Sequence, residues 1–209
     1  MLHLYKKAGF SRILMGVETT SARTQVMIRK GATTDTDREA VRLLRRHDIL
    51  SQVAHVVGFD EETDRDLLRG LRQLVSYDPD MINAMYVTPH RWTPFYRESV
   101  GRCIVEPDQS RWDYRHQVLA TGIPRWRVFL WVKLTEVVMQ LRPRALWRVL
   151  AHRDRGIRKA LRWCYGVGRR AWFFEVREFL LHRHPAPADV TLADLWGAAQ
   201  EEEEASIPA

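Results

Sequence analysis

The sequence predicts an α/β fold followed by a helical region, and three observations lead to that prediction. Short apolar runs at residues 13–17, 49–58 and 81–88 are typical of strands that are buried on both faces. Helical patterns at 34–47 and 60–75 separate these runs. Because a tight turn cannot join parallel strands, helices between them indicate right-handed crossovers and a parallel sheet. The last part of the chain again carries apolar residues at helical spacing.

The first strand is expected at residues 13–17, where an apolar run reaches Gly16 and a carboxylate, Glu18, follows closely. In parallel α/β folds, ligand-binding groups collect just beyond the carboxyl ends of the strands. Glu18 is therefore expected where a small molecule is held. The alternative is that Glu18 caps the next turn or pairs with Arg29 or Lys30.

Caps and apolar spacing predict the helices around the strands. Residues 1–9 are expected to be the last turns of a helix that Gly9 closes. A helix through residue 47 is expected to begin at 34–37, where Thr and Asp occupy capping positions. A second helix is expected to be capped at 60–63. The apolar stripes of these two helices are Ala40, Val41, Leu43 and Leu44, and then Leu67, Leu68, Leu71, Leu74 and Val75.

Residues 89–113 are expected to form a long loop, because three prolines and a glycine interrupt any regular pattern. Two to four helices are predicted after it, and Pro143 ends the first of them. Residues 186–188 break the pattern again, and the acidic run at 200–204 is expected to be a solvated tail. The first helix has one apolar stripe, formed by Trp126, Phe129, Leu130, Leu134, Val137, Val138 and Leu141.

The number of strands limits the architecture. A closed (β/α)₈ barrel typically takes about 250 residues and eight strands, so three strands cannot close one. The pattern leaves two possibilities open. One is a fragment of such a barrel, and the other is a small open α/β layer with a helical extension.

Composition bounds the class of protein. The chain is 45% hydrophobic and contains eight tryptophans, which is enough for a sizeable core. The apolar run 128–132 is far shorter than the roughly 20 residues that span a bilayer, so no spanning helix is expected. Cys103 and Cys164 have neither a metal-ligand spacing nor a disulfide pattern. They indicate free thiols and a cytoplasmic location.

The net charge of +7 is concentrated in residues 124–184, which hold fifteen Lys or Arg and four acidic residues. The plainest interpretation is a helical cover whose arginines are solvated. A basic amphipathic surface also suits an anionic membrane or a nucleic acid. Since the sequence shows no nucleic-acid motif, membrane-surface contact is the favoured binding interpretation and nucleic acid is not expected.

The first strand carries a family resemblance. Gly16-Val17-Glu18-Thr19, followed by Met27-Ile28-Arg29-Lys30-Gly31, is similar to the fourth strand of radical S-adenosylmethionine enzymes, whose usual pattern is Gly-x-Glu-Ser and then Met-x-Lys-Gly. Later segments resemble the same family in the same order. The resemblance implies a partial (β/α) barrel, with the three parallel strands as its strands four, five and six.

Over nearly the whole chain, the resemblance within that family is to the anaerobic oxidative cyclases of bacteriochlorophyll synthesis. It implies closure of the isocyclic ring of magnesium-protoporphyrin IX monomethyl ester, a tetrapyrrole, with water as the oxygen source. Full-length members have a cobalamin-binding domain, a radical barrel and a helical tail. On this plan the chain is the C-terminal part. It divides into barrel and exit loop at 1–113, a basic helical region at 114–185 and a flexible acidic tail at 186–209.

The resemblance also implies a cofactor site. Residues 54–61 partly match the adenine-contacting pattern Gly-x-Ile-x-Gly-x-x-Glu, with Ala54 in place of the first glycine. Residues 86–94 resemble the sixth strand and its Pro-x-x-x-Thr-Pro loop, whose backbone borders the adenine. Glu18 would accept hydrogen bonds from ribose hydroxyls, and Val56 would lie against the adenine. The implied cofactor-binding residues are Gly16, Glu18, Thr19, Val56, Gly58 and Tyr86.

Two histidines near these motifs have structural alternatives. His55 lies mid-strand and is expected to be a core or lumen residue rather than a catalyst. His90 and Arg91 are placed to meet an acidic group of a substrate, although exposed loop residues usually have no specific role. The valines of the second strand are equally typical of any buried strand. No catalytic or metal-ligating residue is assigned.

The family uses S-adenosylmethionine, cobalamin and a [4Fe–4S] cluster held by a Cys-x-x-x-Cys-x-x-Cys motif. Two cysteines 61 positions apart cannot supply that motif. The chain alone is therefore expected neither to assemble a cluster nor to cleave S-adenosylmethionine. It is also expected to aggregate, because the first strand lacks a neighbour on one side. The alternatives are part of a methyltransferase-like enzyme of the same family and a non-enzymatic basic binding module.

Overall fold

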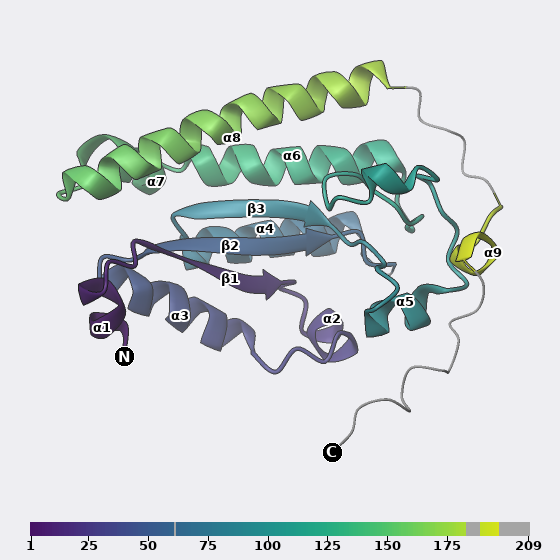
Figure 1. The fold of residues 1–209 in the computed structure, drawn as a ribbon, viewed down its shortest axis with the longest axis horizontal. Coiled ribbons are helices and arrows are strands. Elements are labelled where there is room, and N and C mark those ends of the chain that lie inside the picture. Colours follow the sequence, from purple (N-terminus) through teal and green to yellow (C-terminus); the bar gives the residue numbers. More distant parts are fainter. Residues whose placement is uncertain (61, 183–188, 197–209) are drawn as a thin grey trace.

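The computed structural model describes residues 1–60, 62–182 and 189–196. Within them, three parallel strands form one sheet in the order β1-β2-β3, and helices connect the strands (Figure 1). The strands are β1 (Arg12–Glu18), β2 (Leu50–Val57) and β3 (Met81–Tyr86). The predicted α/β class, the three parallel strands and the helical C-terminal region are confirmed.

The helices follow the predicted order with additions. The larger ones are α3 (Thr34–Arg46), α4 (Asp64–Tyr77), α6 (Arg125–Leu141), α7 (Pro143–Ala151) and α8 (Arg155–Leu181). Shorter ones are α1 (Leu2–Lys7), α2 (Ala22–Met27), α5 (Pro94–Ser99), the 3₁₀ turn η1 (Gln109–Arg111) and α9 (Leu192–Trp196). The expected loop at 89–113 was therefore wrong in part, since α5 and η1 interrupt it. Proline is tolerated in the first turn of a helix, and Pro94 occupies that place in α5.

The two connecting helices begin at threonine caps. Thr33 Oγ1 accepts from the Thr36 amide, and Thr36 Oγ1 accepts from the Thr33 amide in return, which is a reciprocal capping box. Thr63 and Asp66 form the same arrangement at the start of α4. The predicted cap of α4 is confirmed. The cap of α3 lies at Thr33, just before the predicted residues 34–37.

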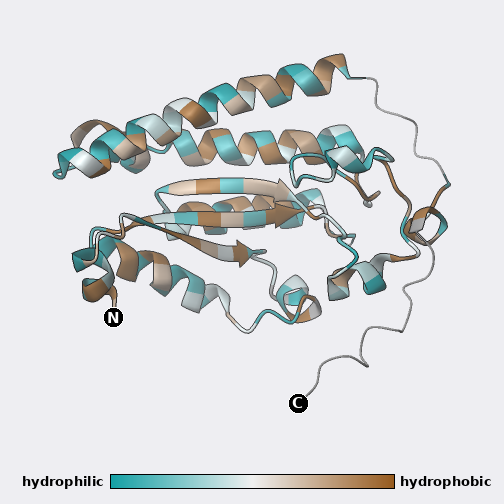
Figure 2. Ribbon diagram, in the orientation of Figure 1, coloured by the Kyte–Doolittle hydropathy of each residue, from teal (hydrophilic) through white to brown (hydrophobic). Residues whose placement is uncertain are grey.

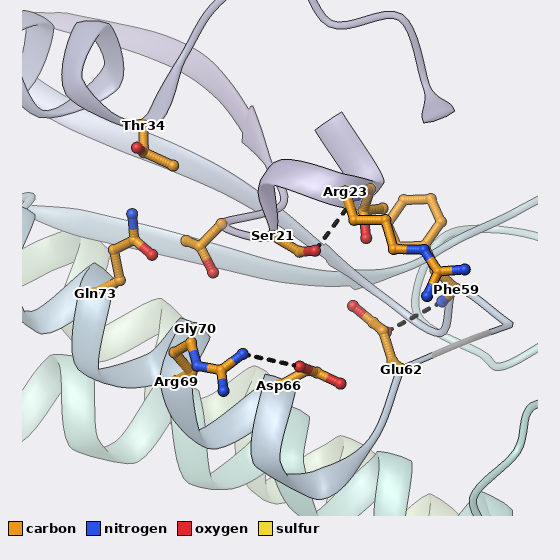
Figure 3. A pocket seen from close by; sticks show the side chains of 11 residues that line it. Ser21, Arg23, Thr34, Phe59, Glu62, Asp66, Arg69, Gly70 and Gln73 are labelled. Carbon is orange, nitrogen blue, oxygen red and sulfur yellow. Dashed lines mark hydrogen bonds and ion pairs between the residues drawn. The ribbon is translucent and has the colours of Figure 1, made fainter. Parts of the chain in front are cut away.

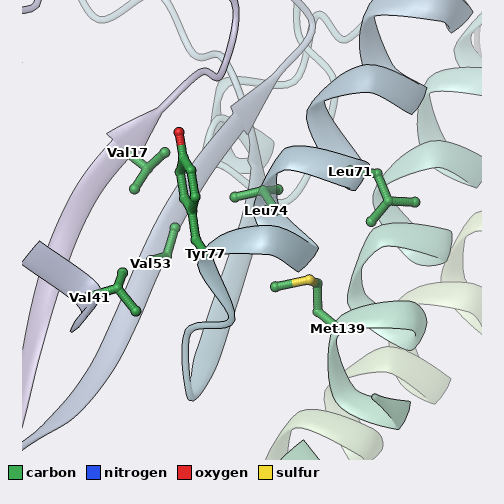
Figure 4. Packing of buried hydrophobic residues seen from close by; sticks show 7 residues of the cluster. All are labelled: Val17, Val41, Val53, Leu71, Leu74, Tyr77 and Met139. Carbon is green, nitrogen blue, oxygen red and sulfur yellow. The ribbon is translucent and has the colours of Figure 1, made fainter. Parts of the chain in front are cut away.

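The main core lies between the sheet and its helices (Figure 4). Val17 of β1 and Val53 of β2 pack with Val41 of α3, Leu74 of α4 and Met139 of α6. A second cluster places Val57 and Tyr86 against Leu67, Val128 and Val132. Because side chains alternate along a strand, the residues between these valines point to the opposite face of the sheet.

We call that opposite side the open face and define it by Leu14, Gly16, Ala54, Val56 and Asn83. Gly16 is the register partner of Ala54, which in turn pairs with Asn83, so these three lie side by side. Leu14 is 61% exposed. The first turns of α8 cover the amino end of this face, where its Ile157 and Leu161 pack on Leu50 of β2. The carboxyl end of the open face is where the predicted cofactor residues lie.

An ion-pair cluster fastens the C-terminal helices to the sheet. Arg142 and Arg148 both donate to the carboxylate of Asp78, which lies at the end of α4, and Arg148 also pairs with Asp80. Burial alone would raise the pKa of Asp78, but the arginines hold that pKa below its usual value. The junction of α6 and α7 is thereby tied to the turn that enters β3.

The apolar stripe predicted on α6 is not its buried side. The helix itself is confirmed, but Trp126, Leu130 and Leu141 are 57%, 56% and 61% exposed. The residues that face the sheet are Val128, Val132, Thr135 and Met139. Apolar residues occur around most of this helix, so the spacing alone could not select the side that packs (Figure 2). Among the described residues, no helix has the length and apolar character needed to cross a membrane.

Candidate functional site

The site predicted from the sequence lies at the carboxyl end of β1 and β2. Gly16 pairs with Ala54, but the register then shifts so that Glu18 lies opposite His55. Glu18 also has a positive φ of 56°. A register shift of this kind is a bulge, which redirects the side chain that follows it. Together with the positive φ, the bulge brings the Glu18 side chain back towards Gly16.

The Glu18 carboxylate lies over Gly16 on the open face. A Cβ atom at residue 16 would overlap Glu18 Oε1, so only glycine leaves room for the carboxylate there. Burial raises the pKa of Glu18, Lys30 opposes that rise, and Asp37 adds to it. The Gly-x-Glu spacing thus has a local structural reason. It places a half-buried acceptor on the side of the sheet that no connecting helix covers.

The structure excludes one of the alternative roles for Glu18, the cap of the next helix, and shows what Lys30 contacts. The cap of α2 is Ser21, whose side chain accepts from the Thr24 amide, so Glu18 does not cap that helix. Lys30 Nζ donates to the Val17 carbonyl at 2.7 Å and to Asp37 at 2.8 Å. Lys30 therefore acts on Glu18 through its charge, while its hydrogen bonds fix the β1–α3 connection.

Thr19 is buried and shapes the turn after β1. Its Oγ1 accepts from the Ser21 amide at 3.1 Å, and its carbonyl accepts from Gln25 Nε2 at 3.0 Å. These contacts give Thr19 a structural role beside Glu18. His55 is 5% exposed, and burial lowers its pKa to about 4. A neutral, buried imidazole agrees with the prediction of a core histidine rather than a catalyst.

The end of β2 is closed by a carboxylate that the sequence motif did not single out. Glu62 Oε2 accepts from the Gly58 amide at 2.7 Å and from the Phe59 amide at 3.1 Å. Gly58 has a φ of 102°, a conformation that favours glycine. Burial raises the pKa of Glu62 to about 7. The family pattern pointed to residue 61, which lies outside the described residues, whereas Glu62 is one position beyond the pattern.

Val56 and Tyr86 do not bring their side chains together. Val56 alternates with the core residues and lies on the open face, half-buried. The Tyr86 side chain lies on the helical side, where burial raises its pKa strongly. The Tyr86 amide donates to the Tyr114 carbonyl at 2.9 Å. Gly16, Glu18 and Val56 therefore share the open face, while Tyr86 reaches the carboxyl end through its backbone.

An aromatic group follows β3. The His90 ring stacks on Trp92, with centroids 4.5 Å apart, and meets Tyr114 edge-on at 5.1 Å. Trp92 is 77% exposed, and Arg91 beside it is also exposed. Burial lowers the pKa of His90, which favours the neutral imidazole. His90 is thus held among aromatic side chains at the end of β3, and a role toward an acidic substrate stays a prediction for His90 and Arg91.

A cleft of about 730 Å³ opens beside this site, between α2 and α4 (Figure 3). Glu62 borders it, and Arg69 donates to Asp66 on its α4 wall. The lining residues do not include Gly16, Glu18 or Val56. The cleft lies next to the predicted cofactor face and is not continuous with it.

The residues present do not fit an iron–sulfur cluster. Cluster ligation needs thiolates brought together, and Cys103 and Cys164 are both free. Within the described ranges, no group of three or more His, Cys, Asp or Glu side chains is placed to hold a metal ion. We therefore derive no chemical step through a cluster held by this chain. S-adenosylmethionine is a different case, since the half-buried carboxylate of Glu18 on the open face has the chemistry to accept hydrogen bonds from hydroxyl groups.

Comparison with known proteins identifies relatives. No family model matches the chain. A protein named anaerobic magnesium-protoporphyrin IX monomethyl ester cyclase from Synechocystis sp. is 48% identical over 205 residues, which cover 98% of this chain and 41% of that protein. The protein of the same name from Cereibacter sphaeroides is 34% identical over 98 residues, or 47% of this chain and 16% of that protein. The one from Rubrivivax gelatinosus is 26% identical over 98 residues, or 47% and 18%.

The first match takes in nearly the whole chain, and the other two carry the same name. The chain spans about two-fifths of the length of the Synechocystis protein. The resemblance predicted from the strand motifs is thus confirmed for part of that protein's length. This chain is a homologue of part of the anaerobic magnesium-protoporphyrin IX monomethyl ester cyclases.

Proposed function

We propose that this chain forms the C-terminal part of a radical S-adenosylmethionine barrel, in an enzyme that closes the isocyclic ring of magnesium-protoporphyrin IX monomethyl ester. The observation that carries the proposal is the Glu18 carboxylate lying over Gly16 on the open face. In a closed barrel that face lines the lumen, and ligands bind at the carboxyl ends of the strands. The homology to the cyclases supports the choice of substrate.

The roles of the individual residues follow from their positions. Glu18 would accept hydrogen bonds from the ribose hydroxyls of S-adenosylmethionine, and Val56 would lie against the adenine. Gly58 would allow close approach of the backbone, because its positive φ and missing side chain leave the strand end open. Thr19 and Glu62 would hold the two strand ends in place through the hydrogen bonds described above. When bound, S-adenosylmethionine supplies the radical chemistry of this family.

The rest of the barrel would join at β1. Within the described residues, β1 pairs with β2 alone, so its other edge is available to a further strand. Residues 1–113 would then be the barrel part and its exit loop, residues 114–185 a helical cover and residues 186–209 a tail. The cluster and the cobalamin would be held by the remainder of the enzyme, and the tetrapyrrole would bind across the completed barrel.

The test is to supply the missing part. The chain would be co-expressed with the portion of the Synechocystis relative that it does not match, and the complex reconstituted anaerobically with iron, sulfide and cobalamin. We expect 5′-deoxyadenosine and the cyclised tetrapyrrole from the complex and neither from the chain alone. A methylated product would indicate the methyltransferase-like alternative. Product from the chain alone would overturn the proposal, because two cysteines would then suffice for a cluster.

A binding measurement tests the site itself. Glu18→Gln keeps the shape of the side chain but removes the charge that strengthens hydrogen bonds from hydroxyl groups. Such bonds contribute about 1.5–3 kcal/mol, so binding of S-adenosylmethionine to the complex should weaken at least tenfold, measured by equilibrium dialysis. Glu39→Gln, on the exposed side of α3, is the matched control. Equal affinities for the two variants would exclude Glu18 from the site.

A further inference from the structure

The outward side of α8 combines cations with large apolar side chains. Trp163, Phe173 and Phe174 are 67%, 67% and 65% exposed, and Leu180 and Leu181 are 75% and 71% exposed. At 3.6 residues per turn, these residues and the exposed basic ones fall within an arc of about 140° of the helix. We call this arc the outer face of α8. Its basic residues are Arg155, Lys159, Arg162, Arg169, Arg170 and Arg177.

The acidic residues of α8 point elsewhere. The helix contains two, Glu175 and Glu178, and both lie outside that arc. Glu175 pairs with Lys133 of α6 and with Arg115, and Glu178 pairs with Arg111. Inward packing is completed by Phe179, whose ring stacks on Phe129 of α6 with centroids 3.8 Å apart. The outer face is therefore purely basic and apolar (Figure 2).

We propose that the outer face of α8 docks on an anionic lipid bilayer, with the helix lying in the plane of the interface. Aromatic and leucine side chains would enter the boundary between head groups and acyl chains, while the arginines would reach the lipid phosphates. With 27 residues, α8 offers a contact about 40 Å long. This inference concerns a surface remote from Glu18 and does not depend on the proposed function.

Charge and apolar contact favour a bilayer over a second copy of the chain or a nucleic acid as the partner of this face. A second copy of the chain would place six cations against six cations, which repel one another across an interface. A nucleic acid would match the charge but leave Leu180 and Leu181 without an apolar partner. A bilayer surface offers phosphates and acyl chains at the same depth. Figure 1 shows α8 along one border of the molecule, so a planar surface can reach the side of the helix that faces away from the sheet.

The proposal is tested by flotation of the 209-residue chain with vesicles through a density gradient. Aggregated protein stays at the bottom of the gradient, so self-association cannot imitate binding. We expect the chain to float with vesicles that contain phosphatidylglycerol and much less with vesicles of phosphatidylcholine alone. Each cation near an anionic surface strengthens binding about fivefold. The triple variant Arg169→Gln, Arg170→Gln, Arg177→Gln should therefore lose about a hundredfold in partition coefficient.

The matched control removes the same charge from α3 and α4, with Arg46→Gln, Arg65→Gln and Arg72→Gln, all exposed residues. It should keep most of the binding.

Phe173→Ser with Phe174→Ser should weaken flotation even at high salt, whereas Leu68→Ser with Val75→Ser on α4 should not. Circular dichroism checks that each variant remains folded. Equal losses for test and control variants, no lipid selectivity, or the same variant pattern on duplex DNA without flotation would overturn the proposal.

Discussion

Two backbone features place the Glu18 carboxylate at the carboxyl end of β1. The bulge after Gly16 and the positive φ of Glu18 bring the carboxylate back over the glycine. The position of the glutamate in the motif therefore depends on the glycine, because the absent side chain of Gly16 leaves the space that the Glu18 carboxylate occupies. At the end of β2, Gly58 and Glu62 form a comparable unit, in which the carboxylate accepts from two successive amides.

Replacement of the motif glycine tests this coupling. In Gly16→Ala, the new methyl group would move the flexible Glu18 side chain out of its present conformation, which costs about 0.5–1.5 kcal/mol. Urea denaturation should show that loss in the free energy of unfolding. Gly31→Ala is the control, because a Cβ there meets no atom within 4 Å. If both variants unfold at the same urea concentration as the parent, Glu18 does not occupy the space over Gly16.

Glu62 predicts a pH dependence of stability. Burial raises its folded pKa to about 7, above an ordinary value of 4.5. The folded state therefore holds the proton more tightly than the unfolded state, so this contribution to stability is complete below about pH 4.5 and is lost as the pH rises to about 7. Glu62→Gln, which cannot ionise, should gain stability relative to the parent between pH 5 and 8 in urea titrations. A constant difference across that range would contradict the raised pKa.

At the scale of elements, the sequence predicted those with a strong local pattern. The three strands and α3, α4 and α6 were predicted because each has a long apolar run or clear helical spacing. The short helices α2 and α5 were missed, since six residues show too little periodicity to recognise. The packed side of α6 was not recoverable either. Its choice depends on β3 and α4, which lie far from it in sequence.

The same limit applies to the candidate site. Glu18 could be placed at a strand end, because strand ends follow from the sequence, and the family resemblance added Gly16 and Val56. Glu62 could not be assigned, because the motif spacing ends at residue 61 and only the fold shows that Glu62 reaches the Gly58 amide. The register shift at Glu18 is likewise a property of strand pairing, which no single strand encodes.

The joint between sheet and C-terminal helices gives a prediction at this scale. Asp78 is 7% exposed and is approached by Arg142 and Arg148, which are 8% and 11% exposed. Asp78→Asn keeps the size and tolerates the left-handed backbone of this residue, but takes the paired carboxylate from the buried Arg142 and leaves Arg148 only Asp80. We expect a loss of about 3 kcal/mol in the free energy of unfolding. Asp35→Asn removes an exposed pair with Arg38 and should change it by under about 1 kcal/mol.

The two edges of the sheet differ. The β3 edge is covered by other parts of the chain, and the β1 edge is not covered by any described strand. Beside β3, α6 packs against the strand and the Tyr114 carbonyl receives the Tyr86 amide. Beside β1, no described strand supplies hydrogen bonds to its outer edge. The Synechocystis relative is longer than this chain, and under the proposed function a further barrel strand would pair with the open edge of β1.

This asymmetry predicts how the isolated chain behaves. An unpaired edge strand beside exposed apolar side chains is a template for pairing between molecules, so the chain alone should self-associate, as light scattering coupled to size exclusion would show. Leu14 is 61% exposed on the open face of that strand, and Leu14→Lys should reduce association because an edge lysine resists strand pairing. Val26→Lys, which adds the same charge at a 78% exposed residue of α2, is the control and should have little effect.

Co-expression with the part of the Synechocystis relative that this chain does not match should suppress association without any substitution, since under the proposed function a neighbouring strand would then occupy the β1 edge. A monodisperse chain whose edge amides are protected from hydrogen exchange would show that something other than a missing strand covers β1.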